Sequence, residues 1–253
     1  MNQNTRSAIW REVAPAKVLI ALVIALVGLF AAMRYIGMFS GIAWRWVLPL
    51  SFVLMSLMSW LLLSATGRTQ IGLQRRVQSC YLLAVVLGGL AAAGCFVLGV
   101  ALYTSTADNW FISIANNYRT MMNTTGFPLW KLHLIFTLPA LIFSPIGEEL
   151  FFRGLLQRTL EERLSAKAST VIECSAFGLI HLCHHGILAT AAGLSFMPVS
   201  GAIWATLMFM VAYLFAWLRQ HCGSLYTAMV AHASFNLCMN ALIFAFLWWP
   251  MSA

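Results

Sequence analysis

Two adjacent glutamates, Glu148 and Glu149, lie inside an apolar stretch, between Leu-Ile-Phe-Ser-Pro-Ile-Gly and Leu-Phe-Phe-Arg-Gly. The whole chain has only seven Asp and Glu residues. A charged side chain at the centre of a membrane helix costs roughly 2.5 kcal/mol or more, and such groups are normally paired and functional. This pair is therefore the first place to look for chemistry.

Helical spacing separates the two carboxylates. Glu149 and Arg153 are four residues apart, so they share one face of a helix and can form an ion pair. Glu148 is turned by about 100° from Glu149 and can point into a cavity that Glu149 does not face. No obvious cation stands near Glu148 in the sequence. We therefore expect a supporting Glu149–Arg153 pair and a reactive Glu148.

Two later apolar stretches carry polar residues at the same helical spacing. Phe177 and His181 are four residues apart, as are His232 and Asn236. Counted along each helix, Glu148 and His232 lie roughly 15 Å, and His181 roughly 20 Å, from one predicted membrane edge. Three helices would thus bring these groups to a similar level near the middle of the membrane.

A carboxylate, an imidazole and a His/Asn pair are the parts of a water-activating hydrolase. Glu148 would be the general base and His181 its partner on the water. His232 and Asn236 would donate hydrogen bonds to the oxyanion of a tetrahedral intermediate. Taken singly, a membrane His or Asn is more often a hydrogen-bonding residue between helices, and Phe177 would be core packing. The combination favours the hydrolase.

The elements that must position these groups are membrane helices. The chain has 253 residues, of which 61% are hydrophobic and 9% are charged, whereas soluble domains average about 25% charged residues. We predict an all-α polytopic transmembrane bundle. The net charge of +8 does not indicate nucleic-acid binding, because basic residues flank membrane spans for topological reasons.

Apolar runs of about 20 residues predict about seven spans, with an eighth re-entrant or interfacial segment still open. They are Val18–Met38, Trp46–Ala65, Cys80–Tyr103, Leu132–Leu156, Ser169–Leu188, Ala202–Leu218 and Ser224–Trp248. The fourth continues as a polar helical extension, Gln157–Leu164. We divide the chain into an N-terminal transmembrane region, residues 1–130, and a catalytic transmembrane core, residues 131–248.

Lysines and arginines predict the orientation. With the N-terminus in the cytoplasm, that side receives Arg6, Arg11, Lys17, Arg68, Arg75, Arg76, Arg153, Arg158, Arg163, Lys167 and Arg219. The other side receives Arg34, Arg45, Arg119 and Lys131. Eleven against four favours a cytoplasmic N-terminus and an outside C-terminus. From its size and lack of extra domains, we expect a protein of the bacterial inner membrane.

Other residues are expected to be less informative. The six cysteines (Cys80, Cys95, Cys174, Cys183, Cys222 and Cys238) show no disulfide or zinc spacing, so we expect small packing residues. Glu173 is expected near the cytoplasmic edge, in water. His184 and His185 are expected at the outer end, facing water. Tryptophans near predicted ends (Trp44, Trp46, Trp110, Trp130, Trp217, Trp248 and Trp249) should be interface anchors.

The three motifs resemble those of the CPBP intramembrane proteases, which include the CaaX prenyl-protein proteases and bacterial peptide-processing enzymes. They are Glu148-Glu149-x-x-x-Arg153, Phe177-x-x-x-His181 and His232-x-x-x-Asn236. The resemblance covers Leu141–Asn236 and implies metal-independent, glutamate-dependent peptide hydrolysis in a cavity open to the cytoplasm and the membrane. It implies Glu148 as base, His181 as its partner, His232 and Asn236 as oxyanion hole, and Glu149 and Arg153 as support.

Several alternatives remain beside this expectation. A zinc site built from His181, His185, His232 and Glu148 is disfavoured, and the His-Glu-x-x-His motif is absent. A catalytically silent immunity or scaffold protein is a second alternative, but such a protein would have no reason to retain all the polar residues of the three motifs. A proton-coupled transporter is less favoured, because the chain shows no inverted repeat. The expected partners are membrane lipids and a membrane-anchored or lipidated peptide or protein. The oligomeric state and the substrate's identity are left open.

Overall fold

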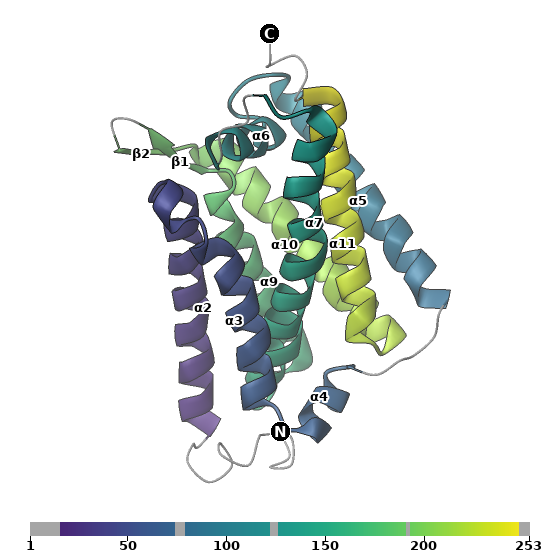
Figure 1. Cartoon of the computed structure of the whole chain (residues 1–253). Helices are drawn as coiled ribbons and strands as arrows, with labels where there is room; N and C mark the ends of the chain where they lie inside the picture. The colour runs from purple at the N-terminus through teal and green to yellow at the C-terminus, as the bar shows by residue number, and fades with distance from the viewer. Residues whose placement is uncertain (1–15, 74–78, 122–125, 191–192, 248–253) are drawn as a thin grey trace.

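The computed structural model describes residues 16–73, 79–121, 126–190 and 193–247. It shows a bundle of long helices with a short β-hairpin at one end (Figure 1). The first half of the chain forms α2 (Ala16–Phe39), the 3₁₀ turn η2 (Ile42–Trp44), α3 (Val47–Leu62), α4 (Ala65–Gln70), α5 (Ser79–Tyr103) and α6 (Trp110–Met121).

The second half begins with α7 (Leu129–Glu148), which continues as a π-helical segment, η3 (Glu149–Leu156), and then as α8 (Gln157–Leu160). It is followed by α9 (Ala166–Ile180), the 3₁₀ turn η4 (His181–Cys183), β1 (Ile187–Thr190), β2 (Gly193–Phe196), α10 (Pro198–Cys222), α11 (Leu225–Leu242) and the π-helical turn η5 (Ile243–Leu247). The two strands are antiparallel, with Ile187 opposite Phe196.

The predicted fold class is confirmed. Within the described residues, six helical stretches are long and apolar enough to cross a membrane. They are Lys17–Phe39, Ile42–Leu62, Cys80–Tyr103, Leu129–Leu160, Pro198–Cys222 and Leu225–Leu247. The predicted span Ser169–Leu188 differs, because α9 has only 15 residues and a span needs about 20. Gly186, at a φ of 109°, lies where the chain leaves η4 and enters the hairpin.

The segment Thr104–Trp130 lies between two predicted spans and contains the helix α6. Asn109 starts this helix by accepting a hydrogen bond from the backbone N–H of Phe111 at 3.0 Å. Trp110 was predicted to be an interface anchor, and this is wrong. Its side chain is fully buried and its indole donates to the carbonyl of Cys95 at 3.1 Å. The hairpin and the start of α10 follow Gly186.

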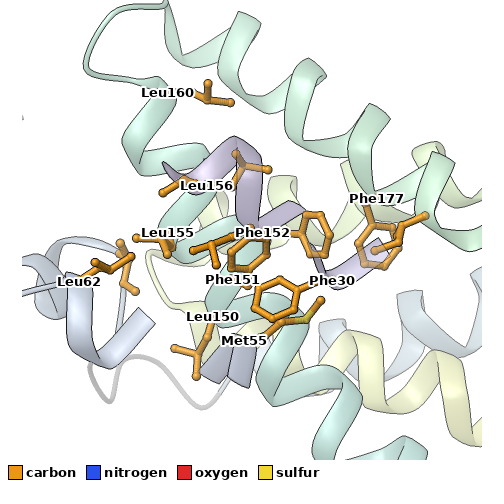
Figure 2. Packing of buried hydrophobic residues seen from close by; sticks show 14 of the residues in the cluster. Phe30, Met55, Leu62, Leu150, Phe151, Phe152, Leu155, Leu156, Leu160 and Phe177 are labelled. Carbon is orange, nitrogen blue, oxygen red and sulfur yellow. The ribbon is translucent and has the colours of Figure 1, made fainter. Parts of the chain in front are cut away.

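The segment η3 is buried on all sides, and this fixes the position of the acidic motif. All eight of its residues are buried. Phe151 packs edge-on against Phe30 of α2, with ring centroids 4.8 Å apart, and Phe152 packs against Phe177 of α9 at 5.4 Å (Figure 2). Met55 of α3 belongs to the same cluster. Three helices therefore close around the segment that carries Glu149 and Arg153.

Small residues allow close helix crossings. Gly88 of α5 lies against the backbone of Ala231 in α11, and a β-carbon at Gly88 would overlap the carbonyl oxygen of Ala231. Gly147 of α7 lies against α3, where a β-carbon would be 2.5 Å from the carbonyl oxygen of Phe52. Since Gly147 precedes Glu148, this second crossing sets the distance between α3 and the reactive carboxylate.

We predict that Gly88→Ala lowers the free energy of unfolding by about 1–3 kcal/mol, because the added carbon meets backbone that cannot rotate away. Gly94→Ala in the same helix is the matched control, since no atom lies within 4 Å of a β-carbon there. That control should be neutral, or stabilising by about 0.5–1 kcal/mol. Unfolding of the purified proteins in one detergent would compare them. Equal stability of the two variants would contradict the close crossing.

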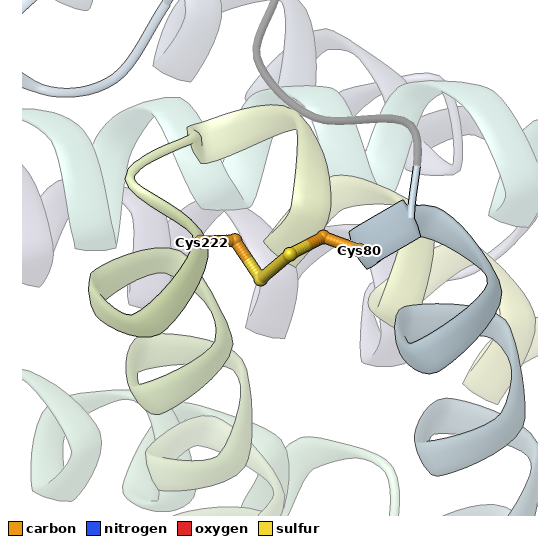
Figure 3. Close-up of a disulfide and its surroundings, with 2 residues drawn as sticks. All are labelled: Cys80 and Cys222. Carbon is orange, nitrogen blue, oxygen red and sulfur yellow. A yellow bond between two sulfur atoms is a disulfide. The ribbon is translucent and has the colours of Figure 1, made fainter.

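Cys80 at the start of α5 and Cys222 at the end of α10 form a disulfide (Figure 3). The prediction that all six cysteines are packing residues is therefore wrong for these two. It is confirmed for Cys95, Cys174 and Cys183, which are buried and free. The bonded pair is 142 residues apart, so it depends on how α5 and α10 pack, and sequence spacing does not reveal that.

Some basic residues used to predict the orientation are not at helix ends. Arg34 and Arg153 are buried inside the bundle. Removing one residue from each side leaves ten against three, so the bias persists. Four of the ten (Arg6, Arg11, Arg75 and Arg76) lie outside the described residues, as do Trp248 and Trp249.

Candidate active site

Glu148 ends α7 in the interior of the bundle and is 1% exposed. Its Oε1 forms an ion pair with the guanidinium of Arg34 from α2, itself 1% exposed. The Arg34 guanidinium also lies over the ring of Phe52, 5.1 Å from its centroid. The sequence around Glu148 offers no cation, and the structure supplies one from a distant part of the chain. The ion pair stabilises the ionised carboxylate, which is the form that accepts a proton.

The second oxygen of Glu148 is placed differently. Its Oε2 is buried without a hydrogen-bond partner among the residues that the structure describes, and it lies 4.0 Å from Nε2 of His232. Ser144, one turn earlier on α7, donates to Oε1 of Glu148 at 3.1 Å and lies 3.5 Å from the same His232 nitrogen. One carboxylate oxygen is thus held by Arg34 and Ser144, and the other remains available beside an imidazole.

A line of buried charged groups holds His232 from the other side. His232 Nδ1 is 2.8 Å from Oε1 of Glu149. Arg153 donates to the same Glu149 oxygen at 3.1 Å, so the predicted Glu149–Arg153 pair is confirmed. The Nε of Arg153 lies 3.1 Å from Oε1 of Glu173 in α9. Glu173 is fully buried, so its expected place in water is wrong.

Aromatic rings cover this line of charges. The Arg153 guanidinium lies over the ring of Phe177, 4.3 Å from its centroid, and over that of Phe215 at 5.6 Å. The ring of His232 stacks on Phe215 at 5.1 Å. These ring faces keep water away from the buried ion pairs. Removing one charged side chain would therefore leave its partners buried without a counter-charge.

His181 begins the 3₁₀ turn after α9, and its ring packs beside Phe177 with centroids 4.3 Å apart, as the sequence spacing predicts. Its Nδ1 is 2.7 Å from the carbonyl oxygen of Phe177. A carbonyl only accepts, so Nδ1 carries the hydrogen and Nε2 of the neutral ring is an acceptor. That nitrogen can accept a hydrogen bond from a water molecule.

Asn236 lies one turn after His232 on α11. Its side-chain Nδ2 donates to the carbonyl of Ala140 in α7 at 2.8 Å. The carboxamide has two N–H groups, so this bond uses one of them. The bond to α7 fixes the orientation of the amide, while the second N–H remains for another acceptor.

These groups line one cavity of about 410 Å³. Glu148, His181, His232 and Asn236, the four predicted catalytic residues, all contribute to its wall, and so does the predicted supporting residue Phe177. Glu149 and Arg153 lie behind this wall. Most of the remaining wall is apolar, from α3, α7, α10 and α11. The structure therefore brings the predicted residues together.

The cavity occupies one half of the bundle. Besides Glu148, its wall includes Arg45 after η2, Asn117 of α6 and His184 after η4. The helix α6 and the hairpin lie at one end of the molecule (Figure 1). The opposite end carries α4, which contains Arg68, and the start of α2, which contains Lys17 (Figure 1). The resemblance implies a cavity open to the cytoplasm, and the charges predict a cytoplasmic N-terminus, whereas α6, which contributes to the cavity wall, lies at the end away from the start of α2.

Of the four residues of the alternative zinc site, Glu148, His181 and His232 line the cavity, whereas His185 does not. His185 is fully buried and its Nδ1 lies 2.8 Å from the hydroxyl of Ser113, away from the cavity wall. The expectation that it faces water is wrong, and His184 is half-buried and lines the cavity. In the described part of the chain, no group of three or more His, Cys, Asp or Glu side chains is arranged to hold a metal ion.

Sequence reasoning missed two members of the site. Arg34 lies inside the predicted span Val18–Met38, and a charge within an apolar run is itself a signal of function. Ser144 precedes Glu148 by four residues and therefore shares its helix face. Both signals were present in the sequence, although neither identifies the partner in space.

The fold and these contacts define a polytopic helical membrane protein with a buried polar site between its helices. Residues 129–238 match the family model described as Rce1-like, type II CAAX prenyl endopeptidase Rce1-like. This part of the chain therefore resembles the Rce1-like domain of the CPBP/CAAX protease family. The match runs from α7 into α11 and leaves Arg34 outside. Comparisons with curated proteins and with solved structures gave no match.

Proposed function

We propose that the protein is an intramembrane endopeptidase that cuts a peptide bond of a membrane-associated protein or peptide with a water activated by Glu148. One observation carries the proposal. The free Oε2 of Glu148 lies 4.0 Å from His232 Nε2, in a cavity whose wall also contains His181 and Asn236. The family match supports the peptidase class.

In the proposed reaction, Glu148 takes a proton from a water molecule while the water oxygen bonds to the carbonyl carbon of the scissile peptide. His181 Nε2 accepts a hydrogen bond from the same water and orients it. The carbonyl oxygen gains the electron pair of the C=O bond and becomes an oxyanion. When the C–N bond breaks, Glu148 passes its proton to the leaving amine. Side chains supply every group, and we propose no metal cofactor.

His232 and Asn236 would donate to the oxyanion. Glu149 accepts only from a protonated Nδ1 of His232, so Nε2 can donate only when the ring carries both protons. The contact with Glu149 at 2.8 Å therefore gives Glu149 a supporting role, which is to hold the His232 ring in one orientation.

We propose a membrane-anchored or lipidated substrate, processed at a C-terminal or leader segment. The largely apolar cavity wall supports this, because it favours an apolar substrate body. For the location, we propose the bacterial inner membrane with a cytoplasmic N-terminus, from the charge bias. In that orientation the cavity lies in the outer half of the membrane. That orientation puts the Cys80–Cys222 disulfide at the cytoplasmic end. Because thiols are usually kept reduced in the cytoplasm, a disulfide that persists in cells would favour the reverse orientation.

Comparative peptidomics of cells carrying the native protein or Glu148→Gln tests the proposal. Peptide termini that form only with the native protein are expected, and they should belong to segments outside the cytoplasm. Identical sets of termini in both strains, at equal protein levels, would contradict the peptidase. Native-only termini confined to cytoplasmic segments would keep the peptidase and reverse the orientation.

A further inference from the structure

The backbone of His181 belongs to the short turn η4, which connects α9 to the hairpin. A 3₁₀ turn has poorer hydrogen-bond geometry than an α-helix and is stable only in short pieces. The ring of His181 is tied to α9 through the bond between its Nδ1 and the carbonyl oxygen of Phe177. The backbone that carries the ring needs a contact from another element to stay in one place.

Trp204 of α10 supplies this contact. Its indole Nε1 donates to the backbone carbonyl of His181 at 3.0 Å. The Trp204 side chain is 1% exposed, and both residues contribute to the wall of the cavity. A buried indole N–H is stable only with an acceptor. The bond therefore ties the position of η4 to that of α10.

Two close backbone crossings bring α10 within reach of the turn. Before the turn, a β-carbon at Gly178 of α9 would be 2.6 Å from the carbonyl oxygen of Ala205. After the turn, a β-carbon at Gly201 of α10 would be 2.8 Å from the Cα of Gly186. Trp204 lies on α10 between these two crossings, so its indole is presented to the turn by a closely packed frame.

A second tryptophan has the same kind of contact in a different place. Trp110 of α6 stacks on Trp204, with ring centroids 6.0 Å apart. Trp110 is also fully buried, and its indole donates to the carbonyl of Cys95 in α5 at 3.1 Å. The two tryptophans thus match in burial and in hydrogen bonding. They differ in the acceptor, because α5 carries none of the residues to which we assign a part in the reaction.

We propose that Trp204 is a positioning residue, whose indole N–H holds the turn η4 so that Nε2 of His181 stays where it orients the attacking water. This inference rests on the proposed function, in which His181 has that role. Trp204 acts through the backbone of His181 and not on the reacting atoms. A displacement of about 1 Å in a catalytic site can lower the rate about 10²-fold. Loss of the bond should therefore lower kcat and leave KM nearly unchanged.

Trp204→Phe removes the indole N–H and keeps an aromatic ring, and Trp110→Phe is the matched control. Each variant loses the stack between the two rings and one bond from an indole to a carbonyl, so both should lower the Tm by similar amounts. Only Trp204→Phe should lower kcat, by about 10–100-fold, with a KM within about twofold of native. The assay uses purified proteins in one bilayer and a peptide that the native protein cleaves in the peptidomic comparison.

The phenyl ring of Trp204→Phe is smaller than an indole and also enlarges the cavity, since Trp204 is part of the wall. Trp204→benzothienylalanine separates the two effects, because sulfur replaces the N–H in a bicyclic ring of nearly the same shape. This variant should keep the native KM and show the low kcat. A native kcat in this variant would overturn the proposal, as would equal losses of kcat in Trp204→Phe and Trp110→Phe.

A His181→Gln background gives a second readout. In that background Trp204→Phe should lower kcat by less than about twofold, because the ring whose position it fixes is absent. A loss as large as in the native background would show that Trp204 acts elsewhere, and the proposal would be wrong. A native protein that cleaves no better than Glu148→Gln would instead count against the endopeptidase itself, and this inference would fall with it.

Discussion

Glu148→Gln should lower the rate of peptide hydrolysis by about 10²–10⁴-fold, the range for loss of a positioned general base. The amide keeps the shape of the side chain and an oxygen that can accept hydrogen bonds from Arg34 and Ser144. It does not accept a proton from water. The loss should therefore appear in kcat, measured with purified protein in a defined bilayer, while substrate binding changes little.

The substitution also leaves the Arg34 guanidinium without its counter-charge, so the stability of the variant must be measured in the same preparation. Glu161→Gln is the matched control, because it neutralises a glutamate of the partly exposed Arg158–Glu161 pair. That control should hydrolyse peptide at the native rate. A folded Glu148→Gln protein with native kcat would show that Glu148 is not the base.

The contacts that sequence spacing predicted are the local ones. Glu149 and Arg153 are four residues apart, as are Phe177 and His181, and helical periodicity places such pairs on one face. Glu148 and Arg34 are 114 residues apart. Their pairing depends on how α2 packs against α3 and η3, and no periodicity within one helix contains that information. In addition, Arg34 was assigned to the outer side of the membrane, so it was not considered as a partner for Glu148.

The burial of Glu173 and the length of α9 illustrate the same limit. Distance from a predicted helix end placed Glu173 near water, yet a tertiary contact with Arg153 keeps it fully buried. The apolar run after Ser169 resembles a span, although the helix ends at Ile180 and the chain turns at Gly186. Hydropathy shows whether a segment is apolar enough to lie in a membrane. Where a helix ends depends on its packing against neighbouring helices.

Arg153→Ala should be the most destabilising single change in the site, with a loss of about 3–5 kcal/mol in the free energy of unfolding. Arg153 is fully buried and faces both Glu149 and Glu173, so its removal leaves two carboxylates without their cation. The aromatic contacts with Phe177 and Phe215 are lost as well. Hydrolysis should also fall, because Glu149 orients His232. Unfolding of the purified variant in detergent would measure the loss.

Arg158→Ala is the matched control for this prediction. Arg158 pairs with Glu161 at 2.9 Å, but the two side chains are 27% and 18% exposed, and such pairs contribute about 0–1 kcal/mol. Near-equal stability of the two variants would contradict the buried network. A third variant separates stranded charge from lost packing. Arg153→Met combined with Glu149→Gln and Glu173→Gln removes all three charges, so it should recover most of the stability without recovering hydrolysis. If stability does not return, packing of the guanidinium between the rings is the larger contribution, and the carboxylates tolerate its absence.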